Sequence, residues 1–214
     1  MLKVENIEVC GFEPAIRGMR NPKNSWGKSD SHFDYENPWC WERPDNEIPV
    51  CIGDNDLDLM KRLFNAGTEH RKYDRMIQVY MDITAPLYWW KEFDTYKIGT
   101  VANSCSTMHK IHDKEFTLDD FSHEHLMMGW EHVLKTIIKE LNHCREQFLI
   151  SKNKVWWWQM IQLLPSSYNQ KRTVMMNYEV VARIIEQRSN HKLDEWHQLV
   201  DVLKTLPYIQ EIMK

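Results

Sequence analysis

The sequence predicts an α/β protein, of the α+β kind, in which long helices pack on a small sheet. Apolar residues nearly alternate over 2–9 and again over 76–83, a pattern that is typical of half-buried strands. They recur at helical spacing over 117–150, 153–164 and 194–206. The helical segments are the longer ones, so we expect a helix-rich chain with few strands.

The size and composition indicate one globular domain that spans residues 1–214. An apolar share of 43% and a charged share of 27% are ordinary for a folded protein. The net charge of -4 gives no general attraction to nucleic acid, so we expect no nucleic-acid partner. No apolar run approaches the ~20 residues that a membrane helix needs, and the alternating N-terminus does not resemble a signal peptide. We therefore expect no membrane contact.

The cysteine pattern predicts a reduced, cytoplasmic chain. The sequence has 5 cysteines at scattered positions, and no two of them form a C-x-x-C pair. It also has no G-x-G-x-x-G or Walker-type loop. A nucleotide cofactor would therefore bind without a Rossmann or phosphate-loop device.

The first third of the chain contains a long irregular segment. From Arg17 to Ile52 the sequence is polar, aromatic and interrupted by four prolines, and loops of this length are often functional. Its tryptophans, Trp26, Trp39 and Trp41, need burial, for which a subunit interface is one possibility. After it, residues 54–56 are expected to cap a short helix through Asn65 that Gly67 ends.

The middle of the chain is predicted to turn from a strand into an aromatic helix. Thr84-Ala85-Pro86 makes the turn, and Pro86 suits the first position of a helix over 87–97. The aromatic cluster Tyr88, Trp89, Trp90 and Phe93 is interpreted as core packing. Thr117–Asp120 is then expected to start a long helix to about Ile150, and a further helix stops ahead of Pro165.

The segment LPSSYNQKRTVMMNYEVVARIIEQR, residues 164–188, contains the strongest local signals. Pro165 stops the preceding helix, a β-prone run follows, and Asn177 is a good N-cap for a helix. The apolar face of that helix is formed by Val180, Val181, Ile184 and Ile185. Arg183 and Arg188 leave this face in other directions, and Arg188 lies near the helix C-terminus.

The spacing of this segment resembles the C-terminal signature of the flavin-dependent thymidylate synthases. That signature is Leu-Pro, eleven residues, Asn, ten residues and Arg, and Asn177 and Arg188 occupy its last two places without a gap. In that family the Asn opens a helix that packs along FAD, and the Arg contacts the uracil of dUMP. The resemblance implies a mixed or antiparallel sheet, and a homotetramer with FAD where subunits meet.

Residues 84–109 carry a second part of the resemblance. The family has an Ala-Pro turn, an aromatic helix that ends in Arg-His-Arg, and a loop with Asn-Glu-x-Ser-x-Arg-Tyr. Ala85-Pro86 and the aromatic helix match, whereas Thr95, Tyr96 and Lys97 stand at the Arg-His-Arg places. In the loop Asn103 and Ser106 match. The acidic, arginine and tyrosine places are held by Ser104, Met108 and His109.

A third part lies at His70–Met76, where the family has a Ser-x-x-Glu-His-type segment beside the flavin. Lys72, Arg75 and Met76 hold the serine, glutamate and histidine places. Beside Asn177, Glu179 and Lys171 stand at two arginine places of the family. A guanidinium grips a phosphate through a planar fork, whereas an ammonium acts as a point charge, so these replacements change how anions are held.

The resemblance thus implies a site with defined residues. Arg188 is the candidate catalytic residue. The substrate would be bound by Glu92, Thr95, Ser104, Ser106, Lys171 and Arg188. The cofactor FAD would be bound by Lys72, Tyr96, Lys97, Asn103, Asn177, Glu179 and Arg183. The clustered His109, His112, His123 and His125 lack an H-E-x-x-H pattern, so no metal is expected. Cys105 is interpreted as an ordinary loop thiol.

The reaction that the resemblance implies is reductive methylation of dUMP to dTMP. Methylenetetrahydrofolate would donate the carbon, reduced FAD the hydride, and NADPH would recharge the flavin. Two alternatives stay open. The chain is also compatible with a divergent flavin- or nucleotide-binding homologue that acts on another substrate, and with a nucleotide-binding oligomer without catalysis. Composition does not separate these three functions.

Overall fold

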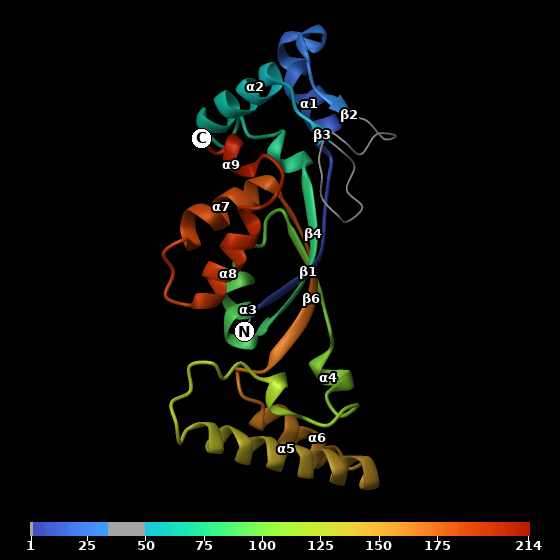
Figure 1. The fold of residues 1–214 in the computed structure, drawn as a ribbon. Helices are drawn as coiled ribbons and strands as arrows, with labels where there is room; N and C mark the ends of the chain where they lie inside the picture. Colours follow the sequence, from blue (N-terminus) through green and yellow to red (C-terminus); the bar gives the residue numbers. More distant parts are fainter. Residues whose placement is uncertain (1, 34–49) are drawn as a thin grey trace. The chain divides into compact units, whose positions relative to one another are not determined.

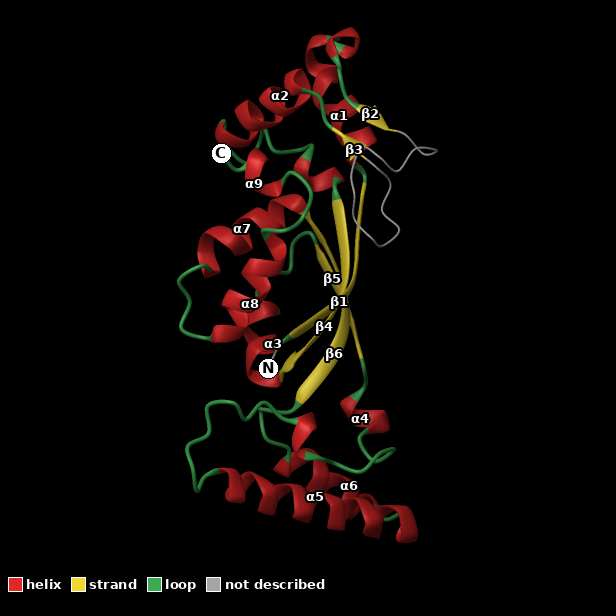
Figure 2. Ribbon diagram, viewed as in Figure 1, coloured by secondary structure: helices red, strands yellow, loops and turns green. Residues whose placement is uncertain are grey.

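The computed structural model describes residues 2–33 and 50–214, and its elements are drawn in Figures 1 and 2. Helices combine with an antiparallel sheet, which confirms the predicted fold class. The larger sheet has four strands in the order β1-β4-β6-β5. Their bounds are Lys3–Cys10 for β1, Gln78–Pro86 for β4, Asn169–Asn177 for β6 and Thr100–Ser104 for β5.

The chain divides into two compact units, described separately below. The first unit consists of the described residues of Met1–Lys3, Ile83–Thr95 and Asn103–Thr173. The second unit consists of those of Val4–Asp82, Tyr96–Ala102 and Val174–Lys214. The assignment of residues 1–214 to a single domain stays a prediction.

A helical hairpin forms the core of the first unit. Helix α5 (Glu131–Ser151) and helix α6 (Lys154–Leu163) pack together through buried side chains that include Leu141 and Met160. Helix α3 (Leu87–Phe93) belongs to the same unit. Its Trp89, Trp90 and Phe93 are almost completely buried with their rings 4.9–5.3 Å apart, so the prediction of core packing is confirmed.

The long helix expected from Thr117 begins later than predicted. Thr117 and Asp120 form a capping box, as the sequence suggests, but they cap only the short 3-10 helix η5 (Leu118–Asp120). Phe121 then becomes extended and pairs with Tyr168 in an isolated antiparallel bridge. Gly129 has φ +97°, a left-handed backbone that cannot continue an α-helix. Helix α5 therefore starts only at Glu131. In the loop before these elements lies the short helix α4 (Thr107–Lys110).

The second unit is built around the helix that the C-terminal signature predicts. Strand β6 passes at Asn177 into helix α7 (Tyr178–Arg188), so both the β-prone run and the helix are confirmed. Helix α8 (Asp194–Leu203) packs on α7 and ends three residues earlier than predicted. Three further elements belong to this unit: helix α9 (Ile209–Ile212), helix α2 (Asp54–Asn65) and the 3-10 helix η4 (Asp74–Met76).

The segment predicted as irregular is partly regular. Helix α1 (Phe12–Arg20) extends into it, and the 3-10 helices η1 (Asn21–Lys23) and η2 (Trp26–Lys28) follow. Strands β2 (His32–Phe33) and β3 (Val50–Cys51) pair antiparallel. Trp26 is 50% exposed, whereas Trp39 and Trp41 lie outside the described residues.

Helix α2 ends at Asn65 as predicted, but residues 54–56 form its first turn and do not cap it. Gly53 is the N-cap residue, and the first-turn amides of Asn55 and Asp56 donate to the Asp30 carboxylate at 2.9 and 3.1 Å. Asp56 itself is fully buried and accepts from Arg20 Nε at 2.6 Å. Within the described residues, no helix is both long and apolar enough to cross a membrane.

Candidate functional site

Asn177 links strand β6 to helix α7 and is buried, with 8% of its surface exposed. Its side-chain oxygen accepts from Val180 N at 3.0 Å, so it caps the helix as the sequence predicts. Its backbone N–H donates to Gly99 O at 3.2 Å. Gly99 has φ +78°, and a Cβ built there would lie 2.4 Å from Asn177 Nδ2. The close packing of these two residues therefore requires glycine at position 99.

Arg188 is the last residue of helix α7, and it lies against two aromatic side chains. Its Nε donates to the hydroxyl of Tyr96 at 2.9 Å. Its Cζ lies 4.6 Å from the ring centroid of Trp196 and 5.6 Å from that of Tyr96, distances that fit cation–π contacts. The candidate catalytic residue and the cofactor candidate Tyr96 are thus direct neighbours.

Arg183 lies one and a half turns earlier on the same helix. Its Cζ is 5.4 Å from the Tyr96 ring centroid, so two guanidinium groups approach one ring. Among the residues that the structure describes, the Arg183 Nε is buried and has no hydrogen-bond partner. A buried donor without an acceptor is rare in folded proteins and suits a site that receives an acceptor from a ligand.

Glu179, in the first turn of α7, forms an ion pair with Arg75 of helix η4. Arg75 also donates through Nη2 to Thr68 O at 2.6 Å. These two side chains hold the places where the family has arginine and glutamate, respectively. The structure therefore places Arg75, from the His70–Met76 segment, beside Glu179 of the C-terminal segment 164–188.

Asp74, beside Arg75, is 1% exposed, and neither of its carboxylate oxygens has a hydrogen-bond partner within the described part of the chain. Burial raises the pKa of Asp74 to about 7, and the neighbouring Tyr73 hydroxyl, followed by the charges of Arg71 and Arg75, opposes part of that rise. Sequence reasoning missed this residue, because an aspartate before an arginine carries no local sign of burial.

The two lysines among the cofactor candidates differ from the residues above. Lys72 and Lys97 are exposed. Lys97 lies between Tyr96 and Ile98, which is 84% exposed. In the second unit the structure thus brings Tyr96, Arg183 and Arg188 together and places Glu179 with Arg75, while Lys72 and Lys97 have their side chains in solvent.

The first unit contains most of the substrate candidates. Thr95 is exposed, and its hydroxyl donates to Glu92 O at 2.7 Å, which closes the last turn after helix α3. Strand β5 ends at Ser104, and Asn103, Ser104 and Ser106 are all exposed. Ser106 accepts from His109 N at 3.0 Å as the N-cap of α4. Lys171 is joined to this loop through its carbonyl, which accepts from Cys105 N at 3.0 Å.

A polar network in the first unit was not predicted from the sequence. Arg172 lies over the ring of Trp90, with its Cζ 4.2 Å from the ring centroid. It donates to Asp94 Oδ1 at 2.7 Å and to Gln170 Oε1 at 2.9 Å. Gln170 in turn donates to Cys105 O at 2.9 Å. This network fixes the loop that carries the substrate candidates. Its only sequence signal was the basic pair Lys171-Arg172.

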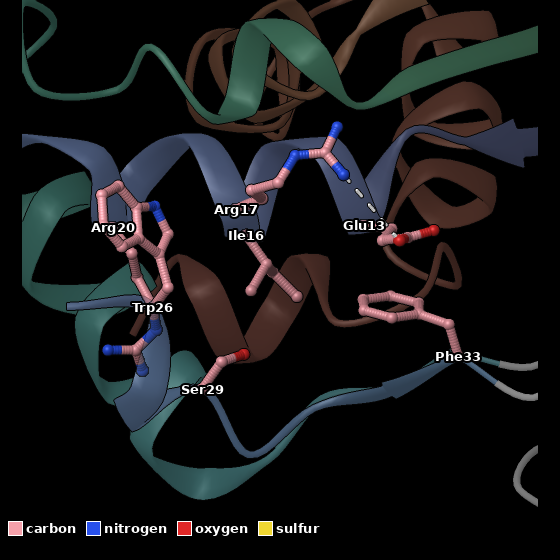
Figure 3. Close-up of a pocket in the computed structure, with 7 residues that line it drawn as sticks. All are labelled: Glu13, Ile16, Arg17, Arg20, Trp26, Ser29 and Phe33. Atoms are coloured by element: carbon pink, nitrogen blue, oxygen red, sulfur yellow. Dashed lines mark ion pairs between the residues drawn. The ribbon is translucent and has the colours of Figure 1, made fainter. Parts of the chain in front are cut away.

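A pocket of about 200 Å³ lies in the second unit, along one stripe of α1 (Figure 3). Its lining residues are Glu13, Ile16, Arg17, Arg20, Trp26, Ser29 and Phe33. None of the predicted site residues is among them. The polar groups at its base have structural partners: Arg20 and Ser29 both donate to the buried Asp56. We therefore attribute this pocket to the way in which a buried ion pair holds α1 to α2.

The comparisons with known proteins identify the fold. No family model matches the sequence, and no curated protein sequence matches it. A crystal structure of thymidylate synthase X (ThyX) from Helicobacter pylori with FAD and dUMP has a TM-score of 0.69 at 16% identity, and covers 100% of this chain and 97% of that one. A second structure, flavin dependent thymidylate synthase ThyX from Helicobacter pylori complexed with FAD and dUMP, has a TM-score of 0.66 at 16% identity, and covers 98% and 97%. The chain has the ThyX fold.

Proposed function

We propose that this chain is a flavin-dependent thymidylate synthase-like protein that binds FAD and dUMP. One observation carries the proposal: helix α7 opens on a buried Asn177 and ends on Arg188, in a chain that shares its fold with ThyX over its full length. The two residues that the family signature requires thus stand at the two ends of one helix. The proposed reaction is reductive methylation of dUMP to dTMP.

The residues around α7 fit a flavin. Within the described part of the chain, the Arg183 Nε is a buried donor that lacks an acceptor, and the missing Cβ of Gly99 permits the close approach of Asn177. The residues proposed to hold the cofactor are Lys72, Tyr96, Lys97, Asn103, Asn177, Glu179 and Arg183. When bound and reduced, FAD supplies a hydride, and methylenetetrahydrofolate and NADPH serve as co-substrates.

Arg188 is proposed to act on the nucleotide. A guanidinium donates to a ring carbonyl and stabilises negative charge on a neighbouring nitrogen, so it can hold uracil in an activated form. The other nucleotide-binding residues are proposed to be Glu92, Thr95, Ser104, Ser106 and Lys171. The assembly is proposed to be a cytoplasmic homotetramer of single-domain chains with the flavin at subunit interfaces.

A second candidate function is a divergent flavin- or nucleotide-binding protein that acts on another substrate, or on none. The observation that favours it is the loss of guanidinium forks at Thr95 and Met108. The Thr95 hydroxyl is engaged with its own backbone turn, and Met108 is 51% exposed. Side chains of this kind offer a phosphate no charge.

The experiment that separates these functions combines flavin detection with a tritium-release assay. The proposal predicts a yellow purified protein that releases tritium from 5-labelled dUMP, and restores growth of a thymidine-requiring bacterial strain. Arg188→Ala is expected to abolish release and rescue. Arg62→Ala is the matched control, because Arg62 pairs with Asp58 on the exposed surface of α2. Bound flavin without tritium release would favour the second candidate function. A colourless protein would contradict the proposal that the chain binds FAD.

A further inference from the structure

The guanidinium of Arg188 lies against two aromatic side chains that come from different parts of the second unit. Tyr96 is 5% exposed and Trp196 is fully buried, so both rings are fixed by their surroundings. Their centroids are 6.0 Å apart in an edge-to-face arrangement. Arg188 stacks on Trp196 at 4.6 Å and bonds to the Tyr96 hydroxyl at 2.9 Å. We call Tyr96 and Trp196 the aromatic pair.

The hydrogen bonds of Tyr96 have a defined direction. An arginine Nε–H can only donate, so the Tyr96 oxygen accepts from Arg188. The single proton of the hydroxyl is then directed to Gln187 Oε1, which lies at 3.0 Å. The chain of donors runs from Arg188 through Tyr96 to Gln187.

We propose that Tyr96 and Trp196 are positioning residues that fix the plane and direction of the Arg188 guanidinium for contact with the nucleotide ring. This inference rests on the proposed function. A guanidinium recognises a planar partner well only when its donors lie in the plane of the acceptors, and an unsupported arginine side chain samples many rotamers. The stack on Trp196 sets the plane, and the bond to Tyr96 sets the rotation within that plane.

The competing explanation is structural. Arg188 ends a helix, where a positive charge is favourable, and its side chain covers the buried Trp196. If the contacts served stability alone, loss of the Tyr96 hydroxyl would lower the free energy of unfolding and leave the affinity for the nucleotide unchanged. If they position Arg188, loss of the hydroxyl affects nucleotide binding only through Arg188. A double-mutant cycle separates these two cases.

The experiment measures the affinity of flavin-loaded protein for dUMP by calorimetry in four forms: unmodified, Tyr96→Phe, Arg188→Ala and the double variant. We expect Tyr96→Phe to weaken binding about tenfold, which is about 1.4 kcal/mol. Arg188→Ala is expected to weaken it about a hundredfold, and the double variant no further. Tyr208→Phe is the matched control, because its hydroxyl also donates once and accepts once, to Val50 O and from Ile52 N, and it should leave dUMP affinity unchanged.

The outcomes distinguish the inference from the proposed function. Unchanged dUMP affinity in Arg188→Ala overturns the proposed function. A hundredfold loss in Arg188→Ala with no loss in Tyr96→Phe, or with effects that add in the double variant, overturns the positioning role alone. Gln187→Met provides a second test that does not disturb the core, because Gln187 is exposed. It removes the acceptor of the tyrosine proton and should weaken dUMP binding about threefold, and an unchanged affinity again counts against the positioning role.

Discussion

The guanidinium of Arg75 forms an ion pair with the carboxylate of Glu179, and thereby ties helix η4 to the first turn of α7. The family that the chain resembles has a glutamate at the first place and an arginine at the second. Both charges are opposite in sign to those of that family pattern, and in this chain the two side chains form an ion pair.

The Arg75–Glu179 ion pair predicts the result of reversing its two charges. Arg75→Glu and Glu179→Arg, made singly, each place like charges side by side and should lower the free energy of unfolding by about 1 kcal/mol. The double reversal should restore most of this loss, although it does not restore the bond from Arg75 to Thr68 O. Urea unfolding measures the effect. If the double variant loses as much unfolding free energy as the two single variants together, the two side chains are not coupled.

The more exposed pair Arg62–Asp58 on α2 is the control for this reversal, since its side chains are 66% and 65% exposed. Its reversal should change stability by less than the reversal at Arg75 and Glu179, and should leave flavin content unchanged. Flavin content is read from the visible absorption of the purified proteins.

The cap of helix α7 predicts a combined effect on stability and cofactor binding. Asn177→Ala removes the acceptor for Val180 N and should cost about 1 kcal/mol of unfolding free energy, together with loss of bound flavin. Asn153→Ala is the matched control, because Asn153 caps α6 in the same way, accepting from Val155 N at 3.0 Å. It should cost similar stability and retain the flavin. If both variants keep the flavin, Asn177 is only a cap.

Asp74 predicts a dependence of stability on pH. Its pKa of about 7 in the folded state is higher than that of an aspartate in an unfolded chain, so between these values the folded state binds more protons. The stabilising contribution of the protonated carboxyl is present at low pH and is lost as the pH rises toward 7. Asp74→Asn stays neutral, so it should be more stable than the unmodified protein at pH 8, by about 2–4 kcal/mol. At pH 5 the difference should have fallen to about 1.5 kcal/mol, and below about pH 4 the two proteins should be alike. Melting curves at the two pH values test this, and a pH-independent difference would contradict it.

The buried pair Arg20–Asp56 predicts the opposite dependence on pH. Burial alone would raise the pKa of Asp56, but hydrogen bonds from Ser29, Ser31 and Arg20 together hold it below its usual value. Its stabilising contribution is therefore present at neutral pH and is lost as the pH falls through that lowered pKa. Asp56→Ala leaves the Arg20 charge buried without its partner and should cost about 3–5 kcal/mol at pH 7. Urea unfolding at pH 7 measures this loss, and a loss below 1 kcal/mol would contradict the assigned role of the pair.

The sequence alone determined the elements whose signals are local. Pro165, the cap at Asn177 and the apolar spacing after it all act within a few residues, and the structure confirms β6 and α7. The aromatic helix after Pro86 is likewise confirmed, but it ends at Phe93 and not at Lys97 as predicted. The start of α5 was predicted too early, because the bridge from Phe121 to Tyr168 joins residues that are far apart in the sequence, and because the left-handed backbone at Gly129 was not foreseen.

Only the tertiary structure decided how the candidate residues are partnered. The cap of α2 comes from Asp30, which precedes the helix by more than twenty residues. Arg75 meets Glu179 across 104 positions, and Tyr96 meets Arg188 across 92. Local propensity contains no information about such pairs, since they form only when burial of apolar faces brings distant segments together. The sequence determined that an asparagine opens this helix and an arginine ends it. The packing of α7 and α8 decided that Tyr96 and Trp196 both contact the arginine.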